Sequence, residues 1–196
     1  MRKITACLYM TMDGHAEFPS YPGSAVPMKE PDPAFKVMWL DRRDEVDTVI
    51  LGRKAFEGQR GFWASDKRKP SDPPYYYEYS RWKDGVLKLV FSHRMKKSDW
   101  QNTKFVSGDI TRIVSRLKRS KGKDIILDGG PSLALEFMRR GLIDDYWIVV
   151  FPVILWKGLT WFGKMAKQQT LKLLSSKSLN DGELVLHYET VRKKWK

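Results

Sequence analysis

The strongest constraint on the fold of this chain lies in residues 124–146, where a short apolar run ends in a glycine turn. Residues 125–127 (Ile-Ile-Leu) have the composition of a buried strand, and Asp128-Gly129-Gly130-Pro131-Ser132 follows at once. After this turn, apolar side chains recur at helical spacing until Gly141. The segment therefore predicts a buried strand, a tight turn, and a helix that begins at the turn.

A turn of this kind is suited to binding an anion. Gly129 and Gly130 allow a ligand to approach the backbone closely, and the start of a helix presents free N–H groups with a partial positive charge. A phosphate of a nucleotide cofactor is the typical ligand. A plain strand-to-helix turn can have the same sequence, so this motif alone leaves both interpretations open.

Elsewhere in the chain, stretches typical of strands alternate with amphipathic stretches typical of helices. We expect further strands at 4–12, 48–51, 87–91, 104–106, 147–150, 171–178 and 184–190, helices at 34–43, 75–85 and 111–121, and loops at 18–33 and 58–74. Such alternation predicts a mainly parallel central sheet with helices on both faces. Asn180-Asp181-Gly182 predicts an antiparallel hairpin at the end. With 196 residues, one domain spanning 1–196 is expected.

Composition limits the possible locations and partners. No apolar run has the length of a membrane span, and the N-terminus lacks the apolar region of a signal peptide. The single cysteine, Cys7, cannot form an internal disulfide and is expected in the core. These features predict a cytoplasmic protein. The three histidines are scattered along the chain, so we predict no metal site.

The net charge of +13 raises the question of nucleic-acid binding. The basic residues are dispersed, and the richest cluster falls on the helix predicted at 111–121, with Arg112, Arg116, Lys118 and Arg119 expected to face outward. A solvated helix face is the favoured interpretation. The aromatic run at 75–77 is the only support for a nucleic-acid surface.

Three predicted strands end in turns that suit a nucleotide. These turns are Gly52-Arg53-Lys54, Ser92-His93-Arg94 and the Asp128–Ser132 turn. In open α/β sheets, ligands bind beyond the carboxyl ends of the strands. If the three turns lie along one sheet edge, together they indicate nucleotide binding much more specifically than any one of them alone.

Together these motifs resemble the dihydrofolate-reductase-like family, which includes the reductase domain of riboflavin biosynthesis. The matching segments are Met12-Asp13-Gly14, residues 47–57, Leu89-Val90-Phe91-Ser92, residues 128–145, and Phe151-Pro152-Val153-Ile154-Leu155 with Lys157-Gly158 and Phe162. They occur in the family's order and cover nearly the whole chain. The resemblance implies a dihydrofolate-reductase-like three-layer αβα fold.

The resemblance also implies NADPH as cofactor. It assigns the cofactor's phosphates to Gly52, Arg53, Lys54 and Ala55, the adenosine side to Ser92 with His93 and Arg94 nearby, and the pyrophosphate to Gly129, Gly130, Pro131, Ser132 and Leu133. A guanidinium fork suits a 2′-phosphate, which favours NADPH over NADH. Solvation of a helix end remains the alternative for the cations at 53 and 54.

This sequence departs from the family pattern at three places, and each departure predicts a difference in the site. Ala55 stands where many relatives have a hydroxyl residue, so one phosphate hydrogen bond is expected to be missing. Trp156 stands near a position where glycine is usual, and it is expected to narrow the pocket or move the loop. The loop at 18–33 is long enough to act as a lid over the substrate.

Two carboxylates, Asp13 and Asp128, are the candidate catalytic residues. By the resemblance, Asp128 occupies the position of an acidic substrate contact in the riboflavin-pathway reductases. Asp13 follows the first strand, but a carboxylate that caps a local turn explains it equally well. True dihydrofolate reductases carry their acid on the first helix. There, Asp41 and Asp44 are expected to be exposed, which argues against folate as the substrate.

The sequence thus predicts an NADPH-dependent oxidoreductase of a small heterocyclic substrate, similar to 5-amino-6-(5-phosphoribosylamino)uracil reductase of riboflavin biosynthesis. The alternatives are a nucleotide-binding member of the fold with other or no catalytic activity and, less favoured, a basic nucleic-acid-binding protein. The resemblance implies a homodimer, with residues 147–156 as a contributor. The expected partner is a small-molecule substrate, with no membrane.

Overall fold

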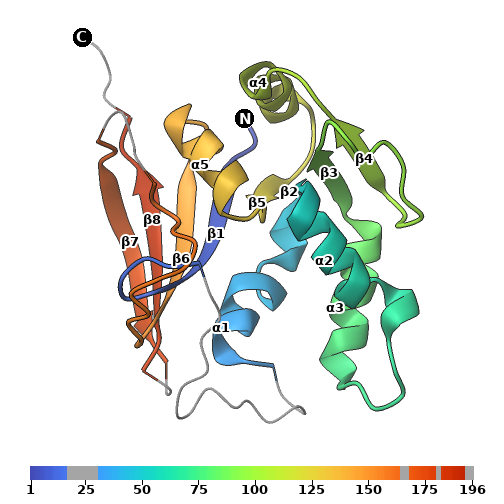
Figure 1. The fold of residues 1–196 in the computed structure, drawn as a ribbon, viewed down its shortest axis with the longest axis horizontal. Coiled ribbons are helices and arrows are strands. Elements are labelled where there is room, and N and C mark those ends of the chain that lie inside the picture. Colours follow the sequence, from blue (N-terminus) through green and yellow to red (C-terminus); the bar gives the residue numbers. More distant parts are fainter. Residues whose placement is uncertain (17–30, 164–167, 180–181, 193–196) are drawn as a thin grey trace.

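The computed structural model describes residues 1–16, 31–163, 168–179 and 182–192. Its strands are β1 (Ile4–Thr11), β2 (Val46–Gly52), β3 (Leu87–Phe91), β4 (Thr103–Val106), β5 (Asp124–Leu127), β6 (Asp145–Phe151), β7 (Leu171–Ser178) and β8 (Leu184–Thr190). They form one sheet in the order β4-β3-β2-β5-β1-β6-β8-β7 (Figure 1). β8 pairs antiparallel with β6 and β7, and the other pairs are parallel. The expected sheet with its antiparallel C-terminal hairpin is confirmed.

Helices lie on both faces of this sheet. They are α1 (Pro33–Phe35), which continues into a π-helical segment (Lys36–Leu40), then α2 (Arg53–Trp63), α3 (Pro74–Gly85), α4 (Ile110–Arg119) and α5 (Pro131–Arg139), with short 3₁₀ turns at Arg43–Glu45 and Ser65–Lys67. One face packs against α4 and α5, and the other against α1, α2 and α3 (Figure 1). The result is a three-layer αβα arrangement.

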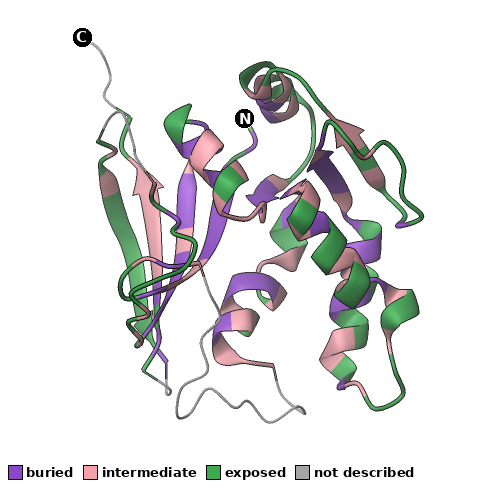
Figure 2. Cartoon of the chain, viewed as in Figure 1, coloured by how far each residue is buried: buried purple, intermediate pink, exposed green. Residues whose placement is uncertain are grey.

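The central strand β5 shows why the apolar runs are uninterrupted. Ile125 and Leu127 pack on the side of α4 and α5, while Ile126 packs among residues of α1 and α3 on the other side. Because both faces of such a strand are buried, its sequence does not alternate between apolar and polar residues. Figure 2 shows burial concentrated in the strands at the middle of the sheet.

Helix α2 is longer than the sequence indicates. A loop was expected from Gly58 to Pro74, but α2 continues through Gly58 and Gly61 to Trp63. A Cβ at either glycine would meet nothing within 4 Å, so both lie on the open side of the helix. Each costs about 1 kcal/mol relative to alanine. Packing of the opposite face, which buries Phe56, offsets that cost.

Two expectations about surface residues need correction. Lys118 was expected to face outward from α4, but its side chain is buried and its Nζ lies 2.5 Å from Asp144 Oδ2. The tyrosine run is part of helix packing, because Tyr75 contacts the ring of Phe35 and Tyr76 contacts that of Trp63. These rings join α1, α2 and α3, so they give no support to a stacking surface for nucleic acid.

The lid expected at 18–33 falls largely on residues 17–30, which lie outside the described residues, as do positions 180 and 181 of the hairpin turn. Across the described ranges, no helix is both long and apolar enough to cross a membrane.

Candidate functional site

The three glycine- and serine-containing turns follow three adjacent strands of the sheet. β3, β2 and β5 are neighbours and run parallel, so the residues after Phe91, Gly52 and Leu127 lie along one edge. The backbone N–H of Asp128 donates to the Ile50 carbonyl at 2.9 Å, which carries the β2–β5 ladder into the turn. The sequence expectation that these turns share a sheet edge is confirmed.

Two of the turns touch through their glycines. A Cβ at Gly52 would lie 2.9 Å from the Gly129 carbonyl oxygen, and one at Gly129 would lie 2.7 Å from Leu133 Cδ2. Gly130 has a φ of +76°, a conformation that favours glycine. The close approach of the two turns therefore depends on the absence of side chains at these positions.

Helices α2 and α5 both begin at this contact. Gly52 and Gly130 are their N-cap residues, and neither helix has a side-chain hydrogen bond at its cap. The first N–H groups of a helix have no intrahelical acceptor. Two uncapped helix starts beside a cradle that a Cβ would fill are well suited to phosphate groups. The backbone donors come from the expected phosphate-contact residues: Arg53, Lys54 and Ala55 in α2, and Ser132 and Leu133 in α5.

The side chains at this edge are accessible to a ligand. Arg53 pairs with Glu57 at 2.8 Å, and both side chains are more than a third exposed. Such a surface pair contributes about 0–1 kcal/mol, so a phosphate can displace it. Ser92 Oγ accepts the backbone N–H groups of Arg94 and Met95 at 3.2 and 2.9 Å, and its own proton can still be donated.

Lys54, His93 and Arg94 are exposed on the same sheet edge. The structure thus brings the sequence-predicted cofactor residues to one edge, with the cationic side chains at the surface and the glycine turns between them.

A cavity of about 420 Å³ adjoins the turns and reaches β1. Its described lining residues are Cys7, Tyr9, Ala16, Phe35, Trp39, Ala55, Gln59, Trp63, Tyr79, Asp128, Gly130, Pro131 and Trp161. Ala55, Gly130 and Pro131 also belong to the two glycine turns, so the cavity is continuous with them. A concave, mostly apolar site of this volume with several aromatic walls is typical of small-molecule binding.

Asp128 lies in this cavity at the end of a buried polar chain. Its Oδ2 accepts from Gln59 Nε2 at 2.5 Å, and Gln59 Oε1 accepts from Lys83 Nζ at 2.7 Å. Lys83 Nζ also lies 3.4 Å from Asp128 Oδ2. The Lys83 side chain is fully buried, whereas Asp128 keeps 22% of its side-chain surface exposed. Lys83 is therefore held behind the cavity wall, and Asp128 faces the interior.

The two ends of this chain have shifted proton affinities. Burial raises the pKa of Asp128, and the nearby Lys83 charge opposes that shift. Burial lowers the pKa of Lys83, and Asp128 opposes that shift in turn. Both changes favour the neutral forms, as expected where water is largely excluded. Carboxyl groups perturbed in this way inside a cavity are typical of functional sites.

Neither Lys83 nor Gln59 was predicted from the sequence as a site residue. Lys83 lies one helical turn after Tyr79 on α3, and its ammonium lies 5.3 Å from the ring centroid of Trp39 and 5.6 Å from those of Tyr79 and Trp82. A lysine on the aromatic face of a helix was the available signal. Gln59 carried no signal, because a loop was expected to begin at Gly58.

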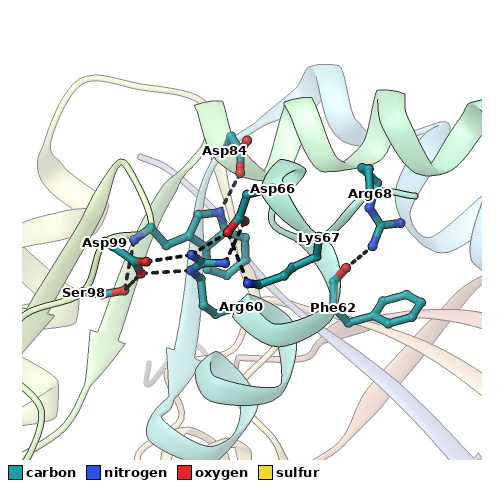
Figure 3. Close-up of polar contacts among 9 residues, drawn as sticks. Arg60, Phe62, Asp66, Lys67, Arg68, Asp84, Ser98 and Asp99 are labelled. Carbon is teal, nitrogen blue, oxygen red and sulfur yellow. Dashed lines mark hydrogen bonds and ion pairs between the residues drawn. The ribbon is translucent and has the colours of Figure 1, made fainter. Parts of the chain in front are cut away.

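The next residue, Arg60, anchors α2 on its outer side. Figure 3 shows its guanidinium between Asp66 and Asp99, and its closest contacts to both carboxylates measure 2.8 Å. These two hydrogen-bonded carboxylates hold the pKa of Arg60 above its ordinary value. The Asp99 pair links α2 to the segment after β3, and the Asp66 pair links α2 to the 3₁₀ turn that follows it.

Asp13, the other candidate catalytic residue, does not line the cavity. It accepts from Thr11 Oγ1 at 2.6 Å and from the backbone N–H groups of Trp156 at 2.8 Å and Leu155 at 3.2 Å. These hydrogen bonds, that of Thr11 foremost, hold the pKa of Asp13 well below its usual value. A carboxylate so engaged is a poor proton donor, and the geometry favours the alternative of a turn-capping residue.

Trp156 does not narrow the cavity, contrary to expectation. It adopts a φ of +65°, and its side chain projects into solvent with 85% exposure. A left-handed backbone favours glycine, the residue that the family resemblance leads us to expect near this position. Trp161, five residues further along the chain, does line the cavity, and its Nε1 donates to the Tyr9 carbonyl at 2.6 Å.

The sheet order and the crevice at its carboxyl edge define a dihydrofolate-reductase-like α/β protein. Residues 2–185 match the RibD C-terminal domain family, and the chain belongs to that family. It is 30% identical over 189 residues to the uncharacterized protein YyaP of Bacillus subtilis (strain 168), covering 95% of each chain.

Two solved structures show the same fold at lower identity. A putative riboflavin biosynthesis protein from Shewanella sp. PV-4 superposes with a TM-score of 0.74 at 19% identity, covering 97% of this chain and 99% of that one. The dihydrofolate reductase of Enterococcus faecalis, complexed with NADP(H), superposes with a TM-score of 0.57 at 11% identity over 96% of each chain.

Proposed function

We propose that this protein is an NADPH-dependent oxidoreductase that reduces a small heterocyclic substrate in the cavity beside Asp128. The observation that carries the proposal is the continuity between this aromatic cavity and the two touching glycine turns, which share Ala55, Gly130 and Pro131 with it. Such continuity supports the proposal, because backbone suited to phosphate groups then adjoins an apolar pocket. The relationship to riboflavin-pathway reductases supports the reaction class.

The cofactor would be held along the sheet edge. The backbone of the Gly52 and Gly129 turns would bind its phosphates, Arg53 would pair with the 2′-phosphate, and Ser92 would contact the adenosine side. When bound, the nicotinamide supplies the hydride. Around it, the aromatic walls of the cavity would keep water from the reacting ring.

Asp128 would bind the substrate and hold the proton that the reduction requires. Its raised pKa lets the carboxyl retain a proton closer to neutral pH than an ordinary aspartate can. The hydrogen bond from Gln59 fixes the position of Asp128 Oδ2 and therefore also orients Asp128 Oδ1. The Gln59 amide does not titrate, so this orientation would not change with its protonation. Asp13 has no part in this scheme.

The homodimer implied by the family resemblance is also proposed. Of the expected contact segment 147–156, the strand β6 lies inside the sheet between β1 and β8. The contribution would therefore come from the loop after it, where Ile154 and Trp156 are exposed. Light scattering after size-exclusion chromatography measures the molar mass of the protein in solution and therefore tests for a dimer.

Cofactor binding tests the proposal through thermal-shift titrations with NADPH and NADH. Arg53→Ala should weaken NADPH far more than NADH, because only NADPH carries the 2′-phosphate. Arg140→Ala is the matched control, since Arg140 pairs with Glu136 at i,i+4 spacing on α5 and is similarly exposed. Equal losses for both cofactors would refute the role of Arg53, and no shift with NADPH would refute the proposal.

A further inference from the structure

The cavity walls select for a flat ligand. Phe35 and Trp63 are stacked with centroids 5.4 Å apart, and Tyr79 meets both rings edge-on at 4.9 and 4.6 Å. These side chains come from three helices and hold one another in place. A pocket whose walls are interlocked ring faces and edges suits a planar ring system.

The polar end of the cavity has a defined hydrogen-bonding pattern. Lys83 can only donate, so Gln59 Oε1 must face it, and Gln59 Nε2 must face Asp128. One N–H of Gln59 Nε2 donates to Asp128 Oδ2, and the second N–H is available to donate to a ligand. Within the described part of the chain, Asp128 Oδ1 receives no hydrogen bond. The Gln59–Asp128 end of the cavity therefore offers Gln59 Nε2 as a donor beside Asp128 Oδ1 as an acceptor.

The charge inside the cavity opposes anions. Of the described lining residues, Asp128 is the only aspartate, glutamate, lysine or arginine. Burial raises the pKa of the Cys7 thiol to about 11, so this residue stays neutral. Lys83 is fully buried behind Gln59 and is already paired with Asp128. Arg53, Lys54 and Arg94 lie outside, on the proposed cofactor edge, and Arg42 does not line the cavity, although its Nη1 lies 3.7 Å from Cys7 Sγ.

We propose that Gln59, oriented by Lys83, acts with Asp128 to select an unphosphorylated, uncharged planar heterocycle that carries an N–H beside a C=O. The N–H donates to Asp128 Oδ1, and the C=O accepts from Gln59 Nε2. This inference rests on the proposed reductase function and concerns the substrate half of the same site. It separates the chain from reductases that act on phosphoribosyl substrates.

Equilibrium binding of four probes tests the inference, using fluorescence of the protein saturated with NADP⁺. Lumazine has the required edge, and 1,3-dimethyllumazine lacks its N–H groups. Uridine and uridine 5′-monophosphate share that edge and differ only in the phosphate. Lumazine should bind at least tenfold more tightly than its dimethyl derivative, because methylation leaves a buried carboxylate unpaired. Uridine should bind more tightly than its monophosphate.

The variant Gln59→Glu replaces the donor with an acceptor at nearly constant shape. It should weaken lumazine by roughly tenfold or more and leave NADPH binding unchanged. Gln101→Glu makes the same charge change at an exposed position and should alter neither affinity. Circular dichroism confirms that each variant is folded, and Gln59→Met repeats the loss without adding charge if the glutamate variant is unstable.

Three outcomes would overturn the inference: no lumazine binding, equal binding of lumazine and its dimethyl derivative, or tighter binding of the monophosphate than of uridine. Each can occur while NADPH still stabilises the protein, in which case the proposed function stands and only the substrate class fails. Loss of NADPH binding by the wild-type protein would instead refute the proposed function.

Discussion

Replacing the buried lysine by an isostere, Lys83→Met, tests the polar chain at the base of the cavity. Methionine is close to lysine in length and flexibility, so the contacts with the surrounding aromatic rings are largely kept. The substitution leaves Gln59 Oε1 without its donor at 2.7 Å and Asp128 without its cation at 3.4 Å. The consequences for stability are therefore electrostatic and not steric.

The expected cost follows from these two losses. An unsatisfied buried acceptor costs about 1–3 kcal/mol, and breaking a buried ion pair costs about 3–5 kcal/mol. Relief of the lysine's own desolvation and the partial exposure of Asp128 to the cavity offset part of this. We expect a net loss of about 2–4 kcal/mol at pH 8.

The loss should depend on pH in a definite direction. Burial raises the folded-state pKa of Asp128, and removing Lys83 raises it further. A carboxyl whose pKa is raised on folding favours the folded state below its unfolded pKa, and this contribution is lost as pH rises through the folded pKa. The variant should therefore be closer to wild type at pH 5 than at pH 8.

Urea unfolding at the two pH values, followed by tryptophan fluorescence, measures this difference. Lys118→Met is the control, because Lys118 also pairs with an aspartate, but Asp144 keeps Arg192 and the backbone N–H of Ile4 as partners. That variant should lose stability with little pH dependence. An equal loss for Lys83→Met at pH 5 and pH 8 would show that Asp128 does not depend on the lysine charge.

The remaining predictions concern backbone space and a second buried lysine. Gly129→Ala should lower stability by about 1–3 kcal/mol and weaken NADPH, because its Cβ would overlap Leu133; unchanged thermal unfolding and affinity would contradict this. Gly61→Ala should raise stability by about 0.5–1 kcal/mol in urea unfolding, since its Cβ meets open space within a helix. Burial lowers the pKa of Lys88 to about 7. The unfolded chain therefore binds a proton that the folded chain does not between pH 7 and about 10, and stability should rise with pH there. Lys88→Met should reduce that rise. If the unfolding free energy of the variant rises with pH as much as that of the wild type, the pKa of Lys88 is not lowered on folding.

Local patterns in the sequence were sufficient for the framework of the site. The apolar run at 125–127, the glycines after it and the helical spacing beyond place β5, its turn and α5, because each signal depends only on neighbouring residues. The turns at Gly52 and Ser92 could be assigned to the same edge, since parallel strands carry their carboxyl ends together. These features predicted the parallel part of the sheet and the edge proposed for the cofactor.

The proposed substrate half of the site could be recognised only from the tertiary structure. Gln59, Lys83 and Asp128 come from α2, α3 and the end of β5, and no local pattern links them. The contact between Asp13 and the backbone N–H of Trp156 was beyond local patterns for a related reason, because the two residues lie 143 positions apart in sequence. Periodicity reports which face of an element is buried. Which buried polar groups meet depends on how helices from separate segments pack over the sheet.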